Sequence, residues 1–473
     1  MLSKILYTFP ELSLLLGIAH LYLRYVFGED SPKLFARIAR YWLLISIFCL
    51  IIFYNQSINL QYFNNDAYTF LFRFVIGISA YILLCVSPQY FSAEKKTGCK
   101  FNCLILLALC VLNIMLSAIN ITVLTFAYCL LTYITYRLQE SAGEELPTSI
   151  KMRYLSAAAV ILLLLTIGFS GLYNLTGGRM EYQFLANILK KEQGSFSTYM
   201  FVSCLLIPFL YSLGIAPFHS FAEDKNGRAI LPVSHYLSII APWAYWGVII
   251  KLNITLVSSY SADITPVYIF FALLSVIFGA MGTNARINLH RIYSFSATYY
   301  FGVMLLLLSL FTPTSCFAAY TCLLTYMLGL NGVYLVFYSI KSRNEYLSAL
   351  TSLSGLAETR PLATATLLIS LFSLIGVPPL AGFLGQASAV TELIAAQKFI
   401  SLGIVFFCLL LLAKSYLEII KTAYFEHKII NYDVENKITR FLMLISIICM
   451  ISIAFNPFNI IDKLKDMFYV VFI

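Results

Sequence analysis

The feature that most constrains this chain is a series of apolar stretches that fills almost the whole sequence. A transmembrane helix needs about 20 predominantly apolar residues. Because a bilayer offers no water to bond exposed backbone groups, apolar runs of this length must be helical. Such runs occur near residues 10–28, 38–55, 67–90, 101–118, 119–138, 153–174, 197–221, 229–252, 264–284, 291–311, 314–340, 363–391, 399–424 and 438–460. The sequence therefore predicts an all-α polytopic membrane protein of about fourteen helices.

The composition excludes a soluble protein. The chain has 473 residues, of which 60% are hydrophobic and 11% charged, and its mean hydropathy is +0.84. An ordinary soluble domain is about 45–50% apolar and about 25% charged. Helices that all pack laterally in lipid form one unit, so we expect a single transmembrane domain over residues 1–473.

The formal net charge of +9 is carried by short loops between the apolar runs. It does not form a basic face interleaved with aromatic residues, so we expect lipid head groups rather than nucleic acid as partners. Most of the eleven cysteines lie inside apolar runs, where a thiol behaves as a small hydrophobe. Cys99 and Cys103 lie close together, but one such pair does not define a metal site.

The basic residues predict the topology. With fourteen spans, alternate loops fall on opposite sides, and most of the lysines and arginines then gather on one of them, which we call the basic side. The positive-inside bias makes this the cytoplasmic or matrix side. Loops with Lys225, Arg228, Lys341 and Arg343 fall on it, whereas Met1 falls on the opposite side.

Two spans carry helix-breaking residues at membrane depth. The seventh contains Gly214 and Pro217, and the twelfth contains Pro378 and Pro379. They are five spans apart, and an odd offset gives two five-helix units of opposite topology. Paired broken helices in an inverted repeat indicate a transport pathway, because unwound backbone is tolerated only where it lines a cavity or is buried in protein. The two predicted repeats cover residues 101–252 and 264–424.

Two stretches, Leu353 to Leu356 and Ser373 to Phe383, form motifs that are specific to one family and follow it almost residue for residue. The chain thereby resembles NADH dehydrogenase subunit 2 and its bacterial counterpart, the antiporter-like membrane-arm subunits of respiratory complex I. The other family-like stretches are Pro10 with Glu11, Ala216 to His219, Leu231 to Ser234, and Arg291 with Ser294 and Ser296, where Asn288 matches the family's asparagine and His290 stands in place of its lysine.

The resemblance implies a subunit that lies between other complex I membrane-arm subunits and couples NADH:ubiquinone oxidoreduction to proton translocation. FMN, the iron–sulfur clusters and ubiquinone would bind other subunits, so no cofactor and no catalytic residue is expected here. The chain has no G-x-G-x-x-G dinucleotide loop, in agreement with this. We expect the mitochondrial inner membrane, or alternatively a bacterial plasma membrane, with lipids such as cardiolipin as further partners.

The family's proton-carrying residues are replaced in this chain. The resemblance implies a buried glutamate in the fifth span and lysines in the seventh, eighth and twelfth. Alignment on the motifs places these four positions at Cys129, Ser212, Pro242 and Gln386. Proline has no side-chain proton, and serine and glutamine can only form hydrogen bonds or hold water.

Other ionisable residues near membrane depth are candidate substitutes. His219 lies at the first helix break, where an imidazole could serve a relay. Lys414 and Glu418 are four residues apart on one helix, so we expect them to pair. Lys251 lies near a span end, where it could act in a relay or extend its amine to the head groups. Arg73 is expected to contact a partner subunit or a lipid phosphate.

Three functions fit these residues. The first is a complex I subunit that still conducts protons through substitutes such as His219, Lys414 and water. The second is a non-conducting structural subunit of the same membrane arm. The third is a subunit of a cation/proton antiporter, to which the family is related. The missing lysines favour the second function over the first and weaken the third.

The topology can be tested by cysteine labelling from each side of the membrane. Cysteines introduced at the 225–228 and 341–343 loops should react from the same, basic side, and one beside Met1 should react from the other. If the two loops react from different sides, the order of spans between them is wrong.

Overall fold

The computed structural model describes residues 8–28, 31–53, 63–91, 95–140, 148–191, 195–343, 345–427, 431–456 and 459–469. Nearly all of these residues are helical. The one hairpin in these ranges pairs β1 (Lys341–Ser342) with β2 (Glu345–Tyr346). The chain divides into two compact units. Unit 1 comprises residues 1–211, 240–260 and 467–473, and unit 2 comprises residues 212–239 and 261–466.

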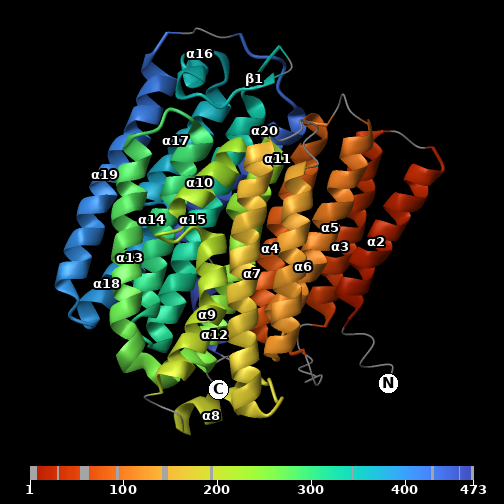
Figure 1. Cartoon of the computed structure of the whole chain (residues 1–473). Helices are drawn as coiled ribbons and strands as arrows, with labels where there is room; N and C mark the ends of the chain where they lie inside the picture. The colour runs from red at the N-terminus through yellow and green to blue at the C-terminus, as the bar shows by residue number, and fades with distance from the viewer. Residues whose placement is uncertain are drawn as a thin grey trace. The chain divides into compact units, whose positions relative to one another are not determined.

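Unit 1 is a bundle of long helices (Figure 1). Its chain order is interrupted, because α12 returns to it from later in the sequence and packs on α4 and α5. Asp66 begins α4 by accepting a hydrogen bond from the Thr69 backbone N–H at 2.8 Å, a typical N-cap. The elements of unit 1 are α2 (Phe9–Val26), α3 (Pro32–Ile52), α4 (Ala67–Val86), η1 (Ser87–Gln89), α5 (Lys95–Ser117), α6 (Ile121–Glu140), α7 (Thr148–Thr176), α8 (Tyr182–Lys191), most of α9 (Phe196–Leu213), α12 (Ala241–Thr255) and η3 (Val257–Tyr260).

Unit 2 is built around α14 and α15. Every residue of α14 except Arg291 is buried, so this helix forms the core of the unit. Helices α13, α17 and α18 pack around the central pair. The elements of unit 2 are α10 (His219–Arg228), α11 (Leu231–His235), the π-helical turn η2 (Tyr236–Ile240), α13 (Ser261–Asn284), α14 (Leu289–Leu308), α15 (Pro313–Ser339), η4 (Leu350–Leu353), α16 (Leu356–Thr359), α17 (Pro361–Ile375), α18 (Ala381–Ala395), α19 (Phe399–Phe425), α20 (Lys437–Ala454) and most of α21 (Ile460–Tyr469).

Within the described ranges, 12 helices are long and apolar enough to cross a membrane. Two of the fourteen expected spans are not among them. The first corresponds to α2, and the twelfth is divided into the shorter helices α17 and α18. The polytopic helical fold is therefore confirmed, whereas the exact span count and the repeat boundaries at 101–252 and 264–424 stay predictions.

The structure interrupts the helix at both predicted places. The first break separates α9 from α10 and contains Gly214 and Pro217. The second separates α17 from α18 and contains Pro378 and Pro379. A glycine with positive φ ends the helix in each case: φ is +71° at Gly214 in the first break and +90° at Gly376 in the second. Glycine adopts this conformation without steric cost, which explains why the helices stop there.

Side chains in unit 2 bind the backbone groups freed by these breaks. The Ala216 N–H donates to Ser275 Oγ at 2.9 Å, and the Gly382 N–H donates to Ser373 Oγ at 3.0 Å. A freed N–H that found no acceptor in lipid would cost several kcal/mol. The two serines therefore allow both breaks to exist at membrane depth.

Glycine at position 382 is required by the close approach of α18 to α17. A Cβ atom there would lie 1.5 Å from the Ser373 carbonyl oxygen. We expect Gly382→Ala to lower the stability of the purified protein by at least about 3 kcal/mol, since such an overlap can be relieved only by moving a helix. Thermal unfolding in detergent measures this.

Gly403→Ala on α19 is the matched control, because a Cβ at Gly403 would meet no atom within 4 Å. Alanine should leave stability unchanged or raise it by up to about 1 kcal/mol. Equal melting temperatures for the two variants would contradict the tight packing at Gly382.

Candidate functional site: a buried polar line in unit 2

Polar residues recur every three or four positions along α14. His290, Tyr293, Ser296 and Tyr300 follow this spacing, and all four are buried. Residues three and four apart lie on the same face of a helix. Burying polar groups in an apolar bundle is costly unless they are hydrogen-bonded. We call this face and the polar groups packed against it the polar line.

Two histidines lie at the end of the polar line where α14 begins. The imidazole of His235, fully buried, stacks on the Tyr334 ring with centroids 4.9 Å apart, and its Nε2 lies 3.3 Å from Asn331 Oδ1. His290 Nδ1 lies 3.5 Å from Ser234 Oγ, which is 2.8 Å from the Tyr334 hydroxyl. We call these five residues the histidine cluster. It joins α11, α14 and α15 through side-chain hydrogen bonds.

The hydrogen bonds leave one nitrogen of His235 available. Asn331 Nδ2 donates to the Met327 carbonyl at 2.9 Å, which fixes Oδ1 as the acceptor that faces His235. The neutral imidazole therefore carries its hydrogen on Nε2. Its Nδ1 is buried and has no hydrogen-bond partner. His235 can accept a proton at Nδ1 without losing its bond to Asn331.

Tyrosine and serine hydroxyls continue the line toward the middle of unit 2. The Ser296 and Tyr416 hydroxyls are hydrogen-bonded to each other, and the Tyr300 hydroxyl donates to the Leu374 carbonyl at the end of α17. The Tyr293 hydroxyl oxygen is buried and has no partner among the protein atoms. An orphaned buried hydroxyl of this kind is a typical site for an ordered water.

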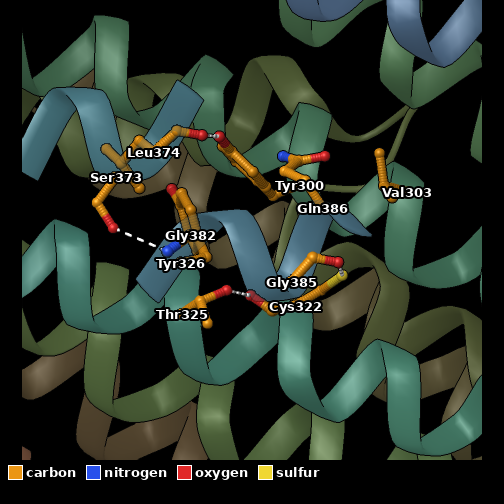
Figure 2. A pocket seen from close by; sticks show the side chains of 10 residues that line it. All are labelled: Tyr300, Val303, Cys322, Thr325, Tyr326, Ser373, Leu374, Gly382, Gly385 and Gln386. Carbon is orange, nitrogen blue, oxygen red and sulfur yellow. Dashed lines mark hydrogen bonds between the residues drawn. The ribbon is translucent and has the colours of Figure 1, made fainter. Parts of the chain in front are cut away.

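Gln386 lines a small cavity in the middle of the line (Figure 2). Tyr300 from α14, Thr325 from α15 and Gln386 from α18 contribute polar side chains to its wall. The cavity leaves about 10 Å³ for the centre of a water molecule, which is room for about one water. Gln386, the predicted position of a family lysine, thus lies beside space that a water can occupy.

Beyond this cavity the line continues along α15 and α18. The Thr321 and Ser388 hydroxyls are 2.8 Å apart. One helical turn farther along α18, Glu392 accepts a hydrogen bond from Thr314 at 2.9 Å, at the exposed end of α15. By the predicted topology this end faces the side opposite the basic side. The polar line therefore extends from the histidine cluster to Glu392 through unit 2.

The other predicted site residues do not all join this line. Cys129 lies half-buried on α6 and Pro242 lies buried at the start of α12, both in unit 1. Ser212 lies half-buried near the end of α9. His219 begins α10, where its ring stacks on Phe278 with centroids 4.9 Å apart and its Nδ1 is buried without a partner.

Two expectations about charged residues are wrong, and so is one of the two alternatives for Lys251. Lys414 and Glu418 form no ion pair in the part of α19 that the structure describes, and both side chains are exposed. Arg73 is 2% exposed and pairs with Glu11, so it is not available to a lipid phosphate or a partner subunit. Lys251 is buried in unit 1 and does not extend to the head groups. Spacing along one helix could not reveal partners that other helices contribute.

Sequence reasoning did not assign a role to His235 or Asn331. His235 directly follows the family-like stretch that ends at Ser234, and the motif resemblance predicts that His290 stands at the position of a family lysine. A histidine in the apolar eighth span, next to a serine, is the signal that could have identified the cluster. Asn331 and Tyr334 give no such signal, because only the packing of α15 against α11 brings them to the imidazoles.

The sequence matches the family model described as "NADH:quinone oxidoreductase/Mrp antiporter, TM" over residues 108–413. It is similar to NADH-ubiquinone oxidoreductase chain 2 of Oenothera berteroana, with 28% identity over 329 residues that cover 68% of this chain and 66% of the plant protein. It is also similar to NADH-quinone oxidoreductase subunit N of Pelagibacter ubique, with 23% identity over 435 residues and 91% coverage of both chains.

Solved structures share the fold at low sequence identity. A chain of respiratory complex I from Thermus thermophilus with bound aureothin superposes with a TM-score of 0.80 at 18% identity, covering 96% of this chain and 99% of that one. A chain of the membrane-bound sulfane sulfur reductase, an archaeal respiratory membrane complex, gives a TM-score of 0.87 at 17% identity, covering 99% and 98%.

The bond between Asn331 and His235 can be tested by mutation. Asn331→Leu should destabilise the protein by about 1–3 kcal/mol, because the His235 Nε2–H loses its acceptor and stays buried. Asn187→Ala is the control, since Asn187 is exposed on α8 and should change stability by no more than about 0.5 kcal/mol. Thermal unfolding in detergent reports both, and an unaffected Asn331→Leu protein would argue against the bond.

Proposed function

The chain belongs to the family of membrane subunits shared by NADH:quinone oxidoreductases and Mrp antiporters, and on that basis we propose that it is a core membrane-arm subunit of a proton-pumping NADH:ubiquinone oxidoreductase. Its contribution is to electron-transport-coupled proton translocation. The structural observation that supports proton translocation is the polar line of unit 2, which passes beside the second helix break at Gln386.

The chain takes no part in the redox chemistry of that complex. FMN, the iron–sulfur clusters and ubiquinone bind other subunits, and this chain transmits the proton part of the reaction. Other membrane-arm subunits and lipids, including cardiolipin, are its partners. The multi-pass chain resides in the mitochondrial inner membrane, or in the plasma membrane if the source is a bacterium.

The polar line gives a route for the proton. His290 begins α14 at the basic side of the predicted topology, and His235 has a free Nδ1 beside it. Protons pass from these imidazoles along the hydroxyls of α14 to the water-sized space at Gln386, and then along α15 and α18 to Glu392. Imidazole is the side chain that titrates most readily near neutral pH. The histidines thus replace the lysines that this chain lacks.

A second function has its own supporting observation. The four family positions at Cys129, Ser212, Pro242 and Gln386 hold no glutamate or lysine, which suits a non-conducting structural subunit of the same complex. The antiporter alternative is weaker, since it would also need those lysines. Both of the first two functions place the chain in the assembled complex, so detecting it there does not distinguish them. Measuring the number of protons moved per electron does.

Membership of the complex predicts how the chain migrates. After gentle solubilisation it should run on a native gel in a very large assembly that carries NADH dehydrogenase activity. Recovery of the chain only as a free monomer, in membranes where that activity is intact, would refute the proposed membership.

The histidine route predicts the effect of replacing His290. His290→Gln keeps hydrogen bonding but cannot titrate, so the number of protons moved per electron should fall while the complex stays assembled. His290→Lys places the family's lysine there and should restore the ratio. The ratio is measured as the acidification of sealed vesicles per NADH oxidised. A normal ratio in His290→Gln would favour the non-conducting structural function.

Alanine substitutions at the predicted family lysine positions should not lower the ratio in the way that His290→Gln does. Gln386→Ala and Ser212→Ala should leave the proton-to-electron ratio nearly unchanged, since neither residue titrates and alanine leaves more room for water. Gln386→Leu should lower the ratio, because leucine keeps about the volume of glutamine, so it admits no further water, and it makes this wall of the space apolar, whereas water needs polar partners. A lowered ratio in an assembled Gln386→Ala complex would show that the amide itself is required.

A further inference from the structure

A buried lysine in unit 1 is not used by the polar line. Lys251 lies one turn before the end of α12 and its side chain is 7% exposed. It is nine residues beyond Pro242, where the resemblance places the lysine of this span. Ionisable residues inside membrane segments are expensive to bury and are typically functional.

Backbone carbonyls hold the Lys251 amine. Its Nζ donates to the Leu116 carbonyl at 3.2 Å and to the Ala118 carbonyl at 2.9 Å. These carbonyls lie at the C-terminal end of α5, where the last carbonyls of a helix lack partners and the helix dipole is negative. The Nζ also lies 5.7 Å from the centroid of the Tyr182 ring, a cation–π contact. Dipoles and a ring therefore stabilise its charge.

The charges around Lys251 are already engaged elsewhere. Arg73 pairs with Glu11 and also donates to Asn65 Oδ1 at 2.7 Å. Asp66 caps α4 through the Thr69 N–H. Among the described residues, no carboxylate lies within ion-pair distance of Lys251. Arg73 is thus ion-paired with a carboxylate, whereas the charged form of the buried Lys251 amine is not stabilised by an ion pair.

We propose that Lys251 is the proton-exchanging group of unit 1, placed at the side of the membrane opposite the basic side. This inference deepens the proposed function and rests on it for the direction of transfer. The loop after α12, at residues 256–262, falls on that opposite side of the predicted topology. Tyr182 at the start of α8 lies beside the amine, and α8 packs on η3 in the same region.

The step is a simple proton transfer. The Lys251 ammonium gives one proton to a water molecule and becomes a neutral amine, and the water becomes hydronium. A hydronium ion arriving from the interior then returns a proton to the amine and becomes water, so one proton has been passed on and the ammonium is restored. Two of the three N–H groups bond the α5 carbonyls, so the third is the one that exchanges.

Three substitutions separate a proton carrier from a fixed cation. Lys251→Arg keeps the charge and the carbonyl bonds, but guanidinium does not release its proton. Lys251→Met removes the charge, and Lys251→His keeps a group that titrates. We expect Arg and Met to lower the proton-to-electron ratio of the assembled complex and His to retain it. Because histidine titrates near pH 6.5 and lysine near about 10.4, the pH profile of Lys251→His should shift to lower pH.

Lys190→Met is the control, since Lys190 is an exposed lysine near the C-terminal end of α8, which also belongs to unit 1. It should leave the ratio unchanged. A normal ratio in either Lys251→Arg or Lys251→Met would overturn the proposal, as would a loss in Lys190→Met equal to that in Lys251→Met.

A second measurement does not depend on complex I membership. Reductive methylation with formaldehyde and a borane modifies only neutral amines, and mass spectrometry of the membrane-embedded protein locates the modified lysines. Lys251 should be methylated, and more so as the pH rises. No methylation at any pH at which the protein stays folded would overturn the proposal, even if the chain is confirmed as a complex I subunit. Methylation of Lys251 in a chain found outside that complex would support proton exchange while refuting the proposed function.

Discussion

The constraint on which the whole structure depends is that every polar group inside a bilayer must find its partner within the protein. It makes the long apolar runs helical, and it decides what happens where a helix stops. The breaks after Leu213 and Ile375 exist because Ser275 and Ser373 bind the freed N–H groups. The same requirement gathers the hydroxyls of α14 into one line, because each must face another polar group or a water.

The polar line of unit 2 meets this constraint mostly with neutral groups. The polar line of unit 2 consists of imidazoles, hydroxyls and two amides, all of which can be neutral, up to Glu392 at its exposed end. Neutral groups cost less to bury than lysines and carboxylates. A line of this kind moves protons only if water completes it, and the cavity at Gln386 and the orphaned Tyr293 hydroxyl mark where water would lie.

The buried charges of unit 1 follow a different rule. Glu11 and Arg73 form an ion pair whose members come from α2 and α4, so neither is free to act elsewhere. The Lys251 amine is held by two backbone carbonyls and the Tyr182 ring instead of an ion pair. A single helix pattern predicts neither arrangement, because both depend on which helices become neighbours. The expected pairing of Lys414 with Glu418 fails for the same reason: i,i+4 spacing makes a contact available, and exposure on α19 removes the need for it.

The sequence by itself determined the helical membrane fold, the two helix breaks and the family, because these follow from run length, from glycine and proline chemistry and from local motifs. It also located Gln386 correctly on the broken span. Only the tertiary structure decided which polar residues meet. His235 and Asn331 are 96 residues apart and their sequence contexts are apolar, yet α11 and α15 bring them within 3.3 Å. Burial and hydrogen bonding are properties of packed helices, and in a chain with so many buried hydroxyls packing alone selects the few that lie along the polar line.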